Sequence, residues 1–186
     1  MRLDCVMTLC IVLSIVSGCD TKGEYRHLRH TLRQFEERPI VFPDKFLCVE
    51  SGATSLRNLS SSLPAFIFYT GPDECNDCTL LHLNDKKDIF NWSEDSNRFL
   101  VYIILDPHPE EIHSLIETIL DYRYPFPVYI NIEGHLQGPD SIPADPRFHS
   151  FLIDCFQRPI LVGNPLINPR VKSMFWSIIG NKSDFA

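Results

Sequence analysis

The chain has 186 residues, a length that suits one ordinary domain with short appendages. Hydrophobic residues make up 44% and charged residues 22%, so the chain can form a packed core and is not expected to be disordered. There are 17 Lys and Arg residues against 24 Asp and Glu, and the net charge of −7 argues against nucleic acid as a partner.

The N-terminal residues have the pattern of a secretory signal. An apolar run from Cys5 to Val16 is too short for a transmembrane helix, which needs about 20 residues, but it fits the core of a signal peptide. The sequence Val-Ser-Gly-Cys at residues 16–19 resembles the bacterial lipobox. By this resemblance, residues 1–18 are removed and the sulfur of Cys19 is lipidated, so that acyl chains anchor the protein to a membrane. An ordinary secretory signal followed by a chance Cys is the alternative.

The remaining chain is expected to form one domain behind a short tether. Residues 19–39 would hold the lipidated Cys, the tether and an amphipathic helix, and residues 40–186 the folded domain. The protein would then lie on the periplasmic or another extracytoplasmic face of a bacterial cell envelope, where disulfides persist.

Apolar patterns predict strands and helices in alternation. Continuous apolar runs predict buried strands, and apolar residues three or four positions apart predict helices. In chain order we predict a helix at 24–37, extended pieces at 40–50, a loop at 51–62, a strand at 64–70, a helix at 75–90, a strand at 99–105, a helix from 109, a strand at 127–132, a hairpin at 148–163 and a helix from 168. This alternation indicates an α/β domain with a mixed sheet.

The sequence Cys-Asn-Asp-Cys at residues 75–78 follows the first long apolar strand directly. Two intervening residues place both sulfurs on one helical turn, close enough to form a disulfide. The amino end of a helix also favours the thiolate form of Cys75. Such a thiolate can attack the disulfide of a partner protein, and Cys78 can then release the mixed disulfide.

This pair has two other interpretations. A zinc site usually needs a second pair of Cys or His ligands, and none is evident, so no metal is expected. A purely structural Cys75–Cys78 disulfide is the more serious alternative. The sequence leaves open whether Cys48 and Cys155 pair with each other or remain thiols.

The order of these parts resembles the thioredoxin-like fold, and specifically the membrane-tethered thiol-disulfide oxidoreductases of bacterial envelopes, including small lipoproteins of the Bacteroidetes type. The resemblance covers about residues 40–182. It implies a three-layer sandwich with a mixed central sheet and helices on both faces. It also implies catalysis by Cys75 and Cys78 without a cofactor.

In that family a cis-proline before the third core strand shapes the substrate groove. If residues 151–154 form that strand, Phe148 holds the position, no cis-proline exists, and His149 lies near the disulfide. If residues 128–130 form it, Pro127 serves instead. We favour the first register because it accounts for both the extra strand and the hairpin.

Three carboxylates surround the reactive sulfur. Asp73, Glu74 and Asp77 lie close to Cys75 in sequence with no Lys or Arg beside them, and like charge disfavours the thiolate. We therefore expect a reducing or slow pair rather than a strong oxidant. The acidic residue that often transfers protons in this family has no clear match, and His82 is the nearest titratable candidate.

These patterns predict an envelope lipoprotein that exchanges disulfides with client proteins. Its partners would be proteins bearing disulfides or thiols, together with the membrane that holds the lipid. The alternative is a non-catalytic thioredoxin-like binding or assembly module whose Cys75–Cys78 disulfide is structural. The sequence identifies neither the clients, the electron donor nor the oligomeric state.

Overall fold

A computed structural model of the chain describes residues 20–59, 61–138 and 141–180. The predicted signal peptide and the lipidation of Cys19 lie outside these residues. The chain divides into two compact units, with the boundary between Gln34 and Phe35. No helix within the described ranges has both the length and the apolar character needed to cross a membrane.

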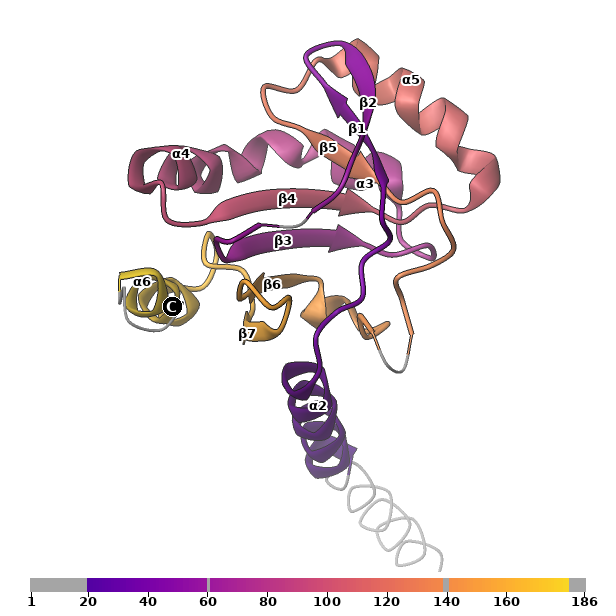
Figure 1. Cartoon of the computed structure of the whole chain (residues 1–186). Helices are drawn as coiled ribbons and strands as arrows, with labels where there is room; N and C mark the ends of the chain where they lie inside the picture. The colour runs from indigo at the N-terminus through magenta and orange to yellow at the C-terminus, as the bar shows by residue number, and fades with distance from the viewer. Residues whose placement is uncertain (1–19, 60, 139–140, 181–186) are drawn as a thin grey trace, which may run out of the picture. The chain divides into compact units, whose positions relative to one another are not determined.

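Within the described residues, the second unit is built on a mixed sheet of seven strands in the order β2-β1-β5-β4-β3-β6-β7 (Figure 1). The strands are β1 Phe46–Glu50, β2 Ala53–Arg57, β3 Ala65–Thr70, β4 Leu100–Leu105, β5 Val128–Ile130, β6 Ser150–Ile153 and β7 Pro159–Val162. The central strands β3, β4 and β5 are parallel, and the other neighbouring pairs are antiparallel. The carboxyl ends of the three parallel strands therefore meet at one edge of the sheet.

The predicted α/β class with a mixed central sheet is confirmed, and so is the favoured register of the third core strand. β6 pairs antiparallel with β3, with Leu152 opposite Phe66, and continues into a hairpin with β7. β2 was predicted as a loop. All five of its residues are exposed, so no burial pattern marked it as a strand.

The helices follow the predicted order. They are α2 Asp20–Glu37, α3 Asn76–Leu81, α4 Lys87–Ser96, α5 Ile112–Tyr122 and α6 Pro169–Gly180, with 3₁₀ turns η2 Leu83–Lys86, η3 Pro109–Glu111 and η4 Pro146–Phe148. α2 begins at Asp20, where a tether was expected.

The single helix predicted over residues 75–90 is interrupted by η2. Leu83 and Ile89 are both fully buried, yet six α-helical residues would leave their side chains about 120° apart. A 3₁₀ turn rotates the chain further per residue, by about 120° instead of 100°, and brings Ile89 back to the core side. The interruption therefore keeps one apolar face along the whole segment.

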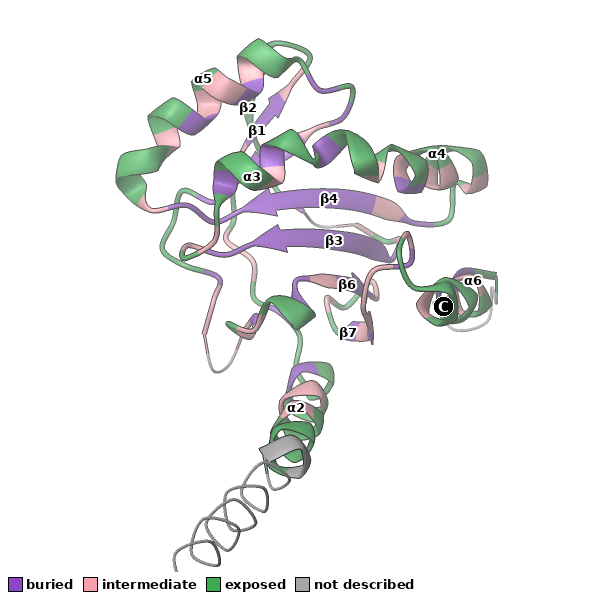
Figure 2. Ribbon diagram, turned by 180° about the vertical axis from the view of Figure 1, so that it is seen from behind, coloured by how far each residue is buried: buried purple, intermediate pink, exposed green. Residues whose placement is uncertain are grey.

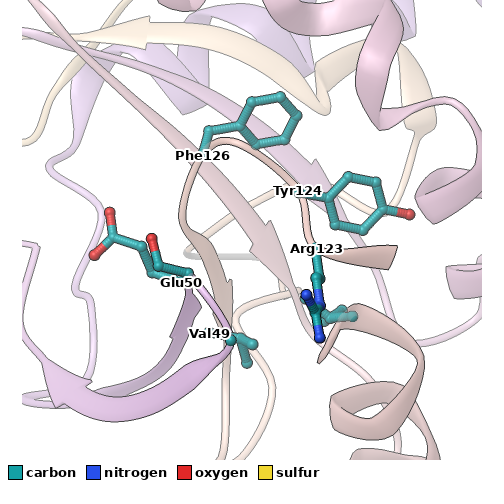
Figure 3. A pocket seen from close by; sticks show the side chains of 8 residues that line it. Val49, Glu50, Arg123, Tyr124 and Phe126 are labelled. Atoms are coloured by element: carbon teal, nitrogen blue, oxygen red, sulfur yellow. The ribbon is translucent and has the colours of Figure 1, made fainter. Parts of the chain in front are cut away.

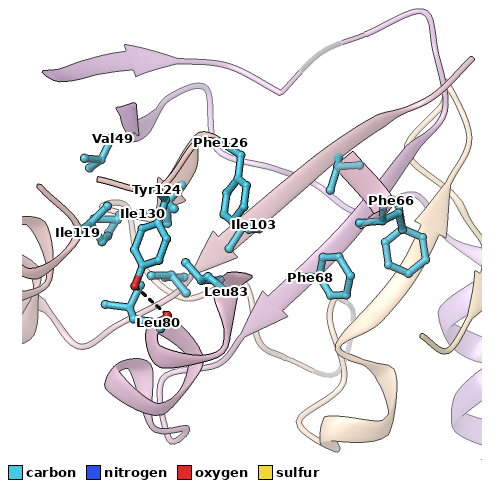
Figure 4. Packing of buried hydrophobic residues seen from close by; sticks show 14 of the residues in the cluster. Val49, Phe66, Phe68, Leu80, Leu83, Ile103, Ile119, Tyr124, Phe126 and Ile130 are labelled. Atoms are coloured by element: carbon cyan, nitrogen blue, oxygen red, sulfur yellow. Dashed lines mark hydrogen bonds between the residues drawn. The ribbon is translucent and has the colours of Figure 1, made fainter. Parts of the chain in front are cut away.

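The main core lies between the sheet and helices α3 to α6. Phe66 and Phe68 of β3 point into it, and Phe66 packs against Phe175 of α6 with ring centroids 5.8 Å apart. Figure 4 shows the side chains of β3, β4 and α3 meeting in this layer, where the Tyr124 hydroxyl donates to the Leu80 carbonyl at 2.7 Å. Figure 2 shows β3 and β4 buried and the outer faces of α4 and α5 exposed.

The opposite face of the sheet is covered by shorter segments. Phe151 of β6 points away from the main core and packs against Phe35 in the last turn of α2, at 5.1 Å between ring centroids. Phe35 also contacts Phe148 of η4 at 6.0 Å. Helical segments therefore contact both faces, as the predicted sandwich requires.

Candidate functional site

Cys75 and Cys78 form a disulfide at the edge of the sheet where β3 ends. Their Cα atoms are 5.2 Å apart and both residues are exposed. Cys75 is the N-cap of α3, and its sulfur accepts a hydrogen bond from the backbone N–H of Cys78 at 3.1 Å. The expected geometry, with two neighbouring exposed sulfurs between a buried strand and a helical turn, is confirmed. The disulfide is therefore accessible to solvent.

The segment around the disulfide is fixed from two sides. Thr70 at the end of β3 donates to the Thr79 hydroxyl of α3 at 3.2 Å. Asn76, which lies between the two cysteines, is buried, and its Nδ2 donates to Glu111 Oε2 of η3 at 3.4 Å. The cysteines are therefore exposed on a backbone that is held in place.

A buried histidine lies directly beneath the loop that precedes Cys75. His149 is 5% exposed, and its Nδ1 lies 2.7 Å from Glu74 Oε2. The same carboxylate oxygen accepts the backbone N–H of Gly71 at 2.7 Å. The favoured register placed His149 near the disulfide, and this contact joins it to the residue next to Cys75. A role for His149 in a client groove stays a prediction.

Behind this pair lies a buried carboxylate that the sequence patterns did not single out as a site residue. Asp106 is fully buried at the carboxyl end of β4. Its Oδ2 accepts from the Tyr69 hydroxyl at 2.6 Å and from the Leu136 N–H at 2.7 Å, and its Oδ1 accepts from Asn131 Nδ2 at 2.7 Å. Burial and the hydrogen bond to Asp106 raise the pKa of Tyr69 far above its ordinary value.

The sequence contains a pattern from which this network could have been predicted. Tyr69, Asp106 and Asn131 are polar residues at or just after the carboxyl ends of three apolar strands. Carboxyl ends of neighbouring parallel strands meet at one edge, which is where ligands and functional groups gather in α/β proteins. This network contacts the His149–Glu74 pair, because the Tyr69 ring packs edge-on against the His149 ring, at 4.8 Å between centroids.

The structure also describes three other predicted site residues, His82, Phe148 and Pro127. His82 is exposed at the end of α3, and its Nδ1 lies 3.1 Å from Asp85 Oδ2. Phe148 is buried in η4. Pro127 precedes the amino end of β5, so it lies at the opposite edge of the sheet from Cys75. No cis peptide bond occurs within the described ranges.

Cys48 and Cys155 are both free thiols. Strand β1, which holds Cys48, and the end of β6, which precedes Cys155, are separated by β5, β4 and β3. Four strand spacings correspond to about 19 Å, well beyond the roughly 7 Å that a disulfide can bridge between Cα atoms. Burial raises the pKa of Cys48. The two thiols therefore cannot pair within one chain.

Two neighbouring pockets lie away from the disulfide. One has a volume of about 10 Å³ and is lined by residues of β1, the β1–β2 turn, α5 and the segment that joins α5 to β5, among them Val49, Arg123 and Phe126 (Figure 3). The other shares Ser51, Gly52 and Arg123 with it. Because β1 ends beside the start of β5, both lie at the edge opposite Cys75.

Within the part of the chain that the structure describes, no group of three or more His, Cys, Asp or Glu residues has the arrangement to hold a metal ion.

No family model matches the chain, and no curated protein matches it. Several solved structures resemble it distantly, each over 77% of this chain. A candidate protein disulfide isomerase from Bacteroides thetaiotaomicron has a TM-score of 0.40 and 15% identity over 88% of its length. An uncharacterized thioredoxin-like protein from Porphyromonas gingivalis has a TM-score of 0.40 and 14% identity over 90% of its length. A thiol:disulfide interchange protein of the thioredoxin family from Chlorobium tepidum TLS has a TM-score of 0.35 and 16% identity over 95% of its length.

Proposed function

We propose that this protein exchanges disulfides with client proteins through Cys75 and Cys78, as a reductase anchored by lipid in a bacterial envelope. The observation that supports the proposal most strongly is the exposure of both sulfurs at the end of a buried strand. A disulfide that only stabilises the fold gains nothing from being accessible to a partner protein. The anchor at Cys19 and the location in the envelope rest on the N-terminal sequence pattern alone.

In the proposed reaction, the reduced protein transfers two electrons to a client disulfide. The Cys75 thiolate attacks one client sulfur, which forms a mixed disulfide and releases a client thiolate that takes up a proton. Cys78 then loses its proton and attacks Cys75, which releases the second client thiol and forms the Cys75–Cys78 disulfide. A dithiol donor protein would reduce the pair again.

The direction of exchange follows from the charges near the pair. Asp73 has a side chain 89% exposed, and Asp77 is exposed on the first turn of α3. Both carboxylates disfavour a thiolate on Cys75, and a less stable reduced form corresponds to a reducing couple. The Glu74 carboxylate disfavours the Cys75 thiolate less than the sequence suggested, because it faces the His149 ring.

Replacing Cys78 by Ser should trap clients. Without the resolving thiol, the mixed disulfide between Cys75 and a client cannot be released, so covalent complexes should accumulate. They would be detected as dithiothreitol-sensitive bands on non-reducing gels of envelope fractions and identified by mass spectrometry.

The matched control is the same Cys78→Ser variant carrying Cys155→Ser, which removes a partly exposed thiol outside the pair and should keep every trapped band. Adding Cys75→Ser instead should remove them all. If no client is trapped and the wild-type protein also fails to reduce insulin, the non-catalytic binding module becomes the better account.

A further inference from the structure

Both ring nitrogens of His149 point at hydrogen-bond acceptors. Nδ1 lies 2.7 Å from Glu74 Oε2, and Nε2 lies 2.8 Å from the carbonyl oxygen of Pro143. A backbone carbonyl can only accept, and an ionised carboxylate can only accept. A neutral imidazole has one donor and one acceptor nitrogen, so it satisfies only one of these contacts. Both contacts form together when the ring is an imidazolium.

The geometry at Glu74 indicates that it is the ionised partner. Its Oε2 receives two donors at short distance, the His149 ring and the Gly71 N–H, each at 2.7 Å. Short contacts of this kind are typical of charge-assisted hydrogen bonds. His149 is buried and Glu74 is half-buried, so water screens the pair only weakly.

Other charged and titratable groups face the pair from each neighbouring element. Tyr69 of β3 packs against the His149 ring and donates to Asp106 behind it. Asp145, in the segment before η4, is paired with Arg147, whose side-chain hydrogen bonds lower the pKa of Asp145. Of these groups, Glu74 alone bonds directly to the ring and is the chain neighbour of Cys75.

We propose that His149 is a positioning residue for the redox pair: a buried imidazolium that neutralises Glu74 and thereby increases the fraction of Cys75 present as thiolate. This inference rests on the proposed exchange function, since it concerns the reactivity of the same sulfur. Without the imidazolium, the Glu74 carboxylate adds a third negative charge beside Cys75, next to those of Asp73 and Asp77. The thiolate is then less stable and the attacking sulfur less reactive.

The test measures alkylation of Cys75 by iodoacetamide at pH 7 in the full-length Cys78→Ser protein, with Cys155 as the internal reference thiol. His149→Gln should slow the reaction of Cys75 about tenfold and leave Cys155 unchanged. Glu74→Gln should not slow it. The double variant His149→Gln, Glu74→Gln again has no net charge at the pair, as in the parent, and should return to within about twofold of the parent rate. A purely structural role for His149 would not produce this rescue.

A second measurement keeps the proposal testable if His149→Gln fails to fold. Nitrogen NMR of the wild-type protein at pH 7 should show both ring nitrogens of His149 carrying protons. An unprotonated ring nitrogen would overturn the proposal, and so would a double variant as slow as His149→Gln. Failure of the exchange function is a separate result, because it would appear as absent insulin reduction by the wild type whatever the alkylation rates.

Discussion

Cys75→Ser is expected to reduce disulfide exchange to the uncatalysed background. The thiolate is the attacking group in every turnover, and a serine hydroxyl cannot form the mixed disulfide. The measurement is reduction of insulin by dithiothreitol, with and without the protein. Cys78 remains in this variant, but with Ser at position 75 it has no partner thiol to release a mixed disulfide. Of the other described cysteines, Cys48 is buried in β1 and Cys155 lies at the far end of β6 from the pair.

The matched control for this variant is Cys155→Ser, which should keep wild-type activity. Both substitutions replace a thiol by a hydroxyl at a site that is not fully buried, so they differ only in position. Substantial activity in Cys75→Ser, or an equal loss in Cys155→Ser, would contradict the assignment of Cys75 as the nucleophile.

Asp106→Ala should give the largest loss of stability among the site residues, about 3–5 kcal/mol of unfolding free energy. The substitution leaves three buried donors without their acceptor: the Tyr69 hydroxyl, the Asn131 amide and the Leu136 N–H. Each orphaned donor costs about 1–3 kcal/mol when it cannot reach water. Urea denaturation of the oxidised protein measures the change.

Two variants separate the buried network from a general effect of losing an aspartate. Asp106→Asn keeps the side-chain shape and one acceptor oxygen, so it should cost less than Asp106→Ala. Asp121→Ala removes an exposed carboxylate from α5 and should change the unfolding free energy by no more than about 0.5 kcal/mol. Asp106→Ala within that same range would show that the carboxylate does not hold the edge of the sheet.

The sequence was sufficient to predict the strands that are buried along their whole length. β3 and β4 have apolar residues on both faces because helices and loop segments cover both sides, and such runs are recognisable without a structure. The register of β6 was predicted correctly because only that register accounts for β5 and the β6–β7 hairpin together. The position of the cysteine pair followed from its place after β3.

The features that escaped prediction depend on contacts between distant segments. β2 is exposed on both faces and is held to β1 by backbone pairing and by the ion pair between Arg57 and Glu50, so its side chains give no periodic burial signal. The contact between Glu74 and His149 joins residues 75 positions apart. Only the antiparallel pairing of β3 with β6 brings these two residues together. The same pairing places the proposed imidazolium of His149 against the Glu74 carboxylate beside Cys75.

The proposed function requires that the Cys75–Cys78 disulfide of the folded protein be exchangeable. The decisive measurement is equilibration in glutathione buffers of graded redox poise, with the oxidised fraction read by mass spectrometry and the fold by circular dichroism. We expect a reversible two-electron transition between about −300 and −200 mV while the protein stays folded. A disulfide that resists reduction until the protein unfolds would contradict the claim, and a midpoint near −120 mV would contradict the reducing direction.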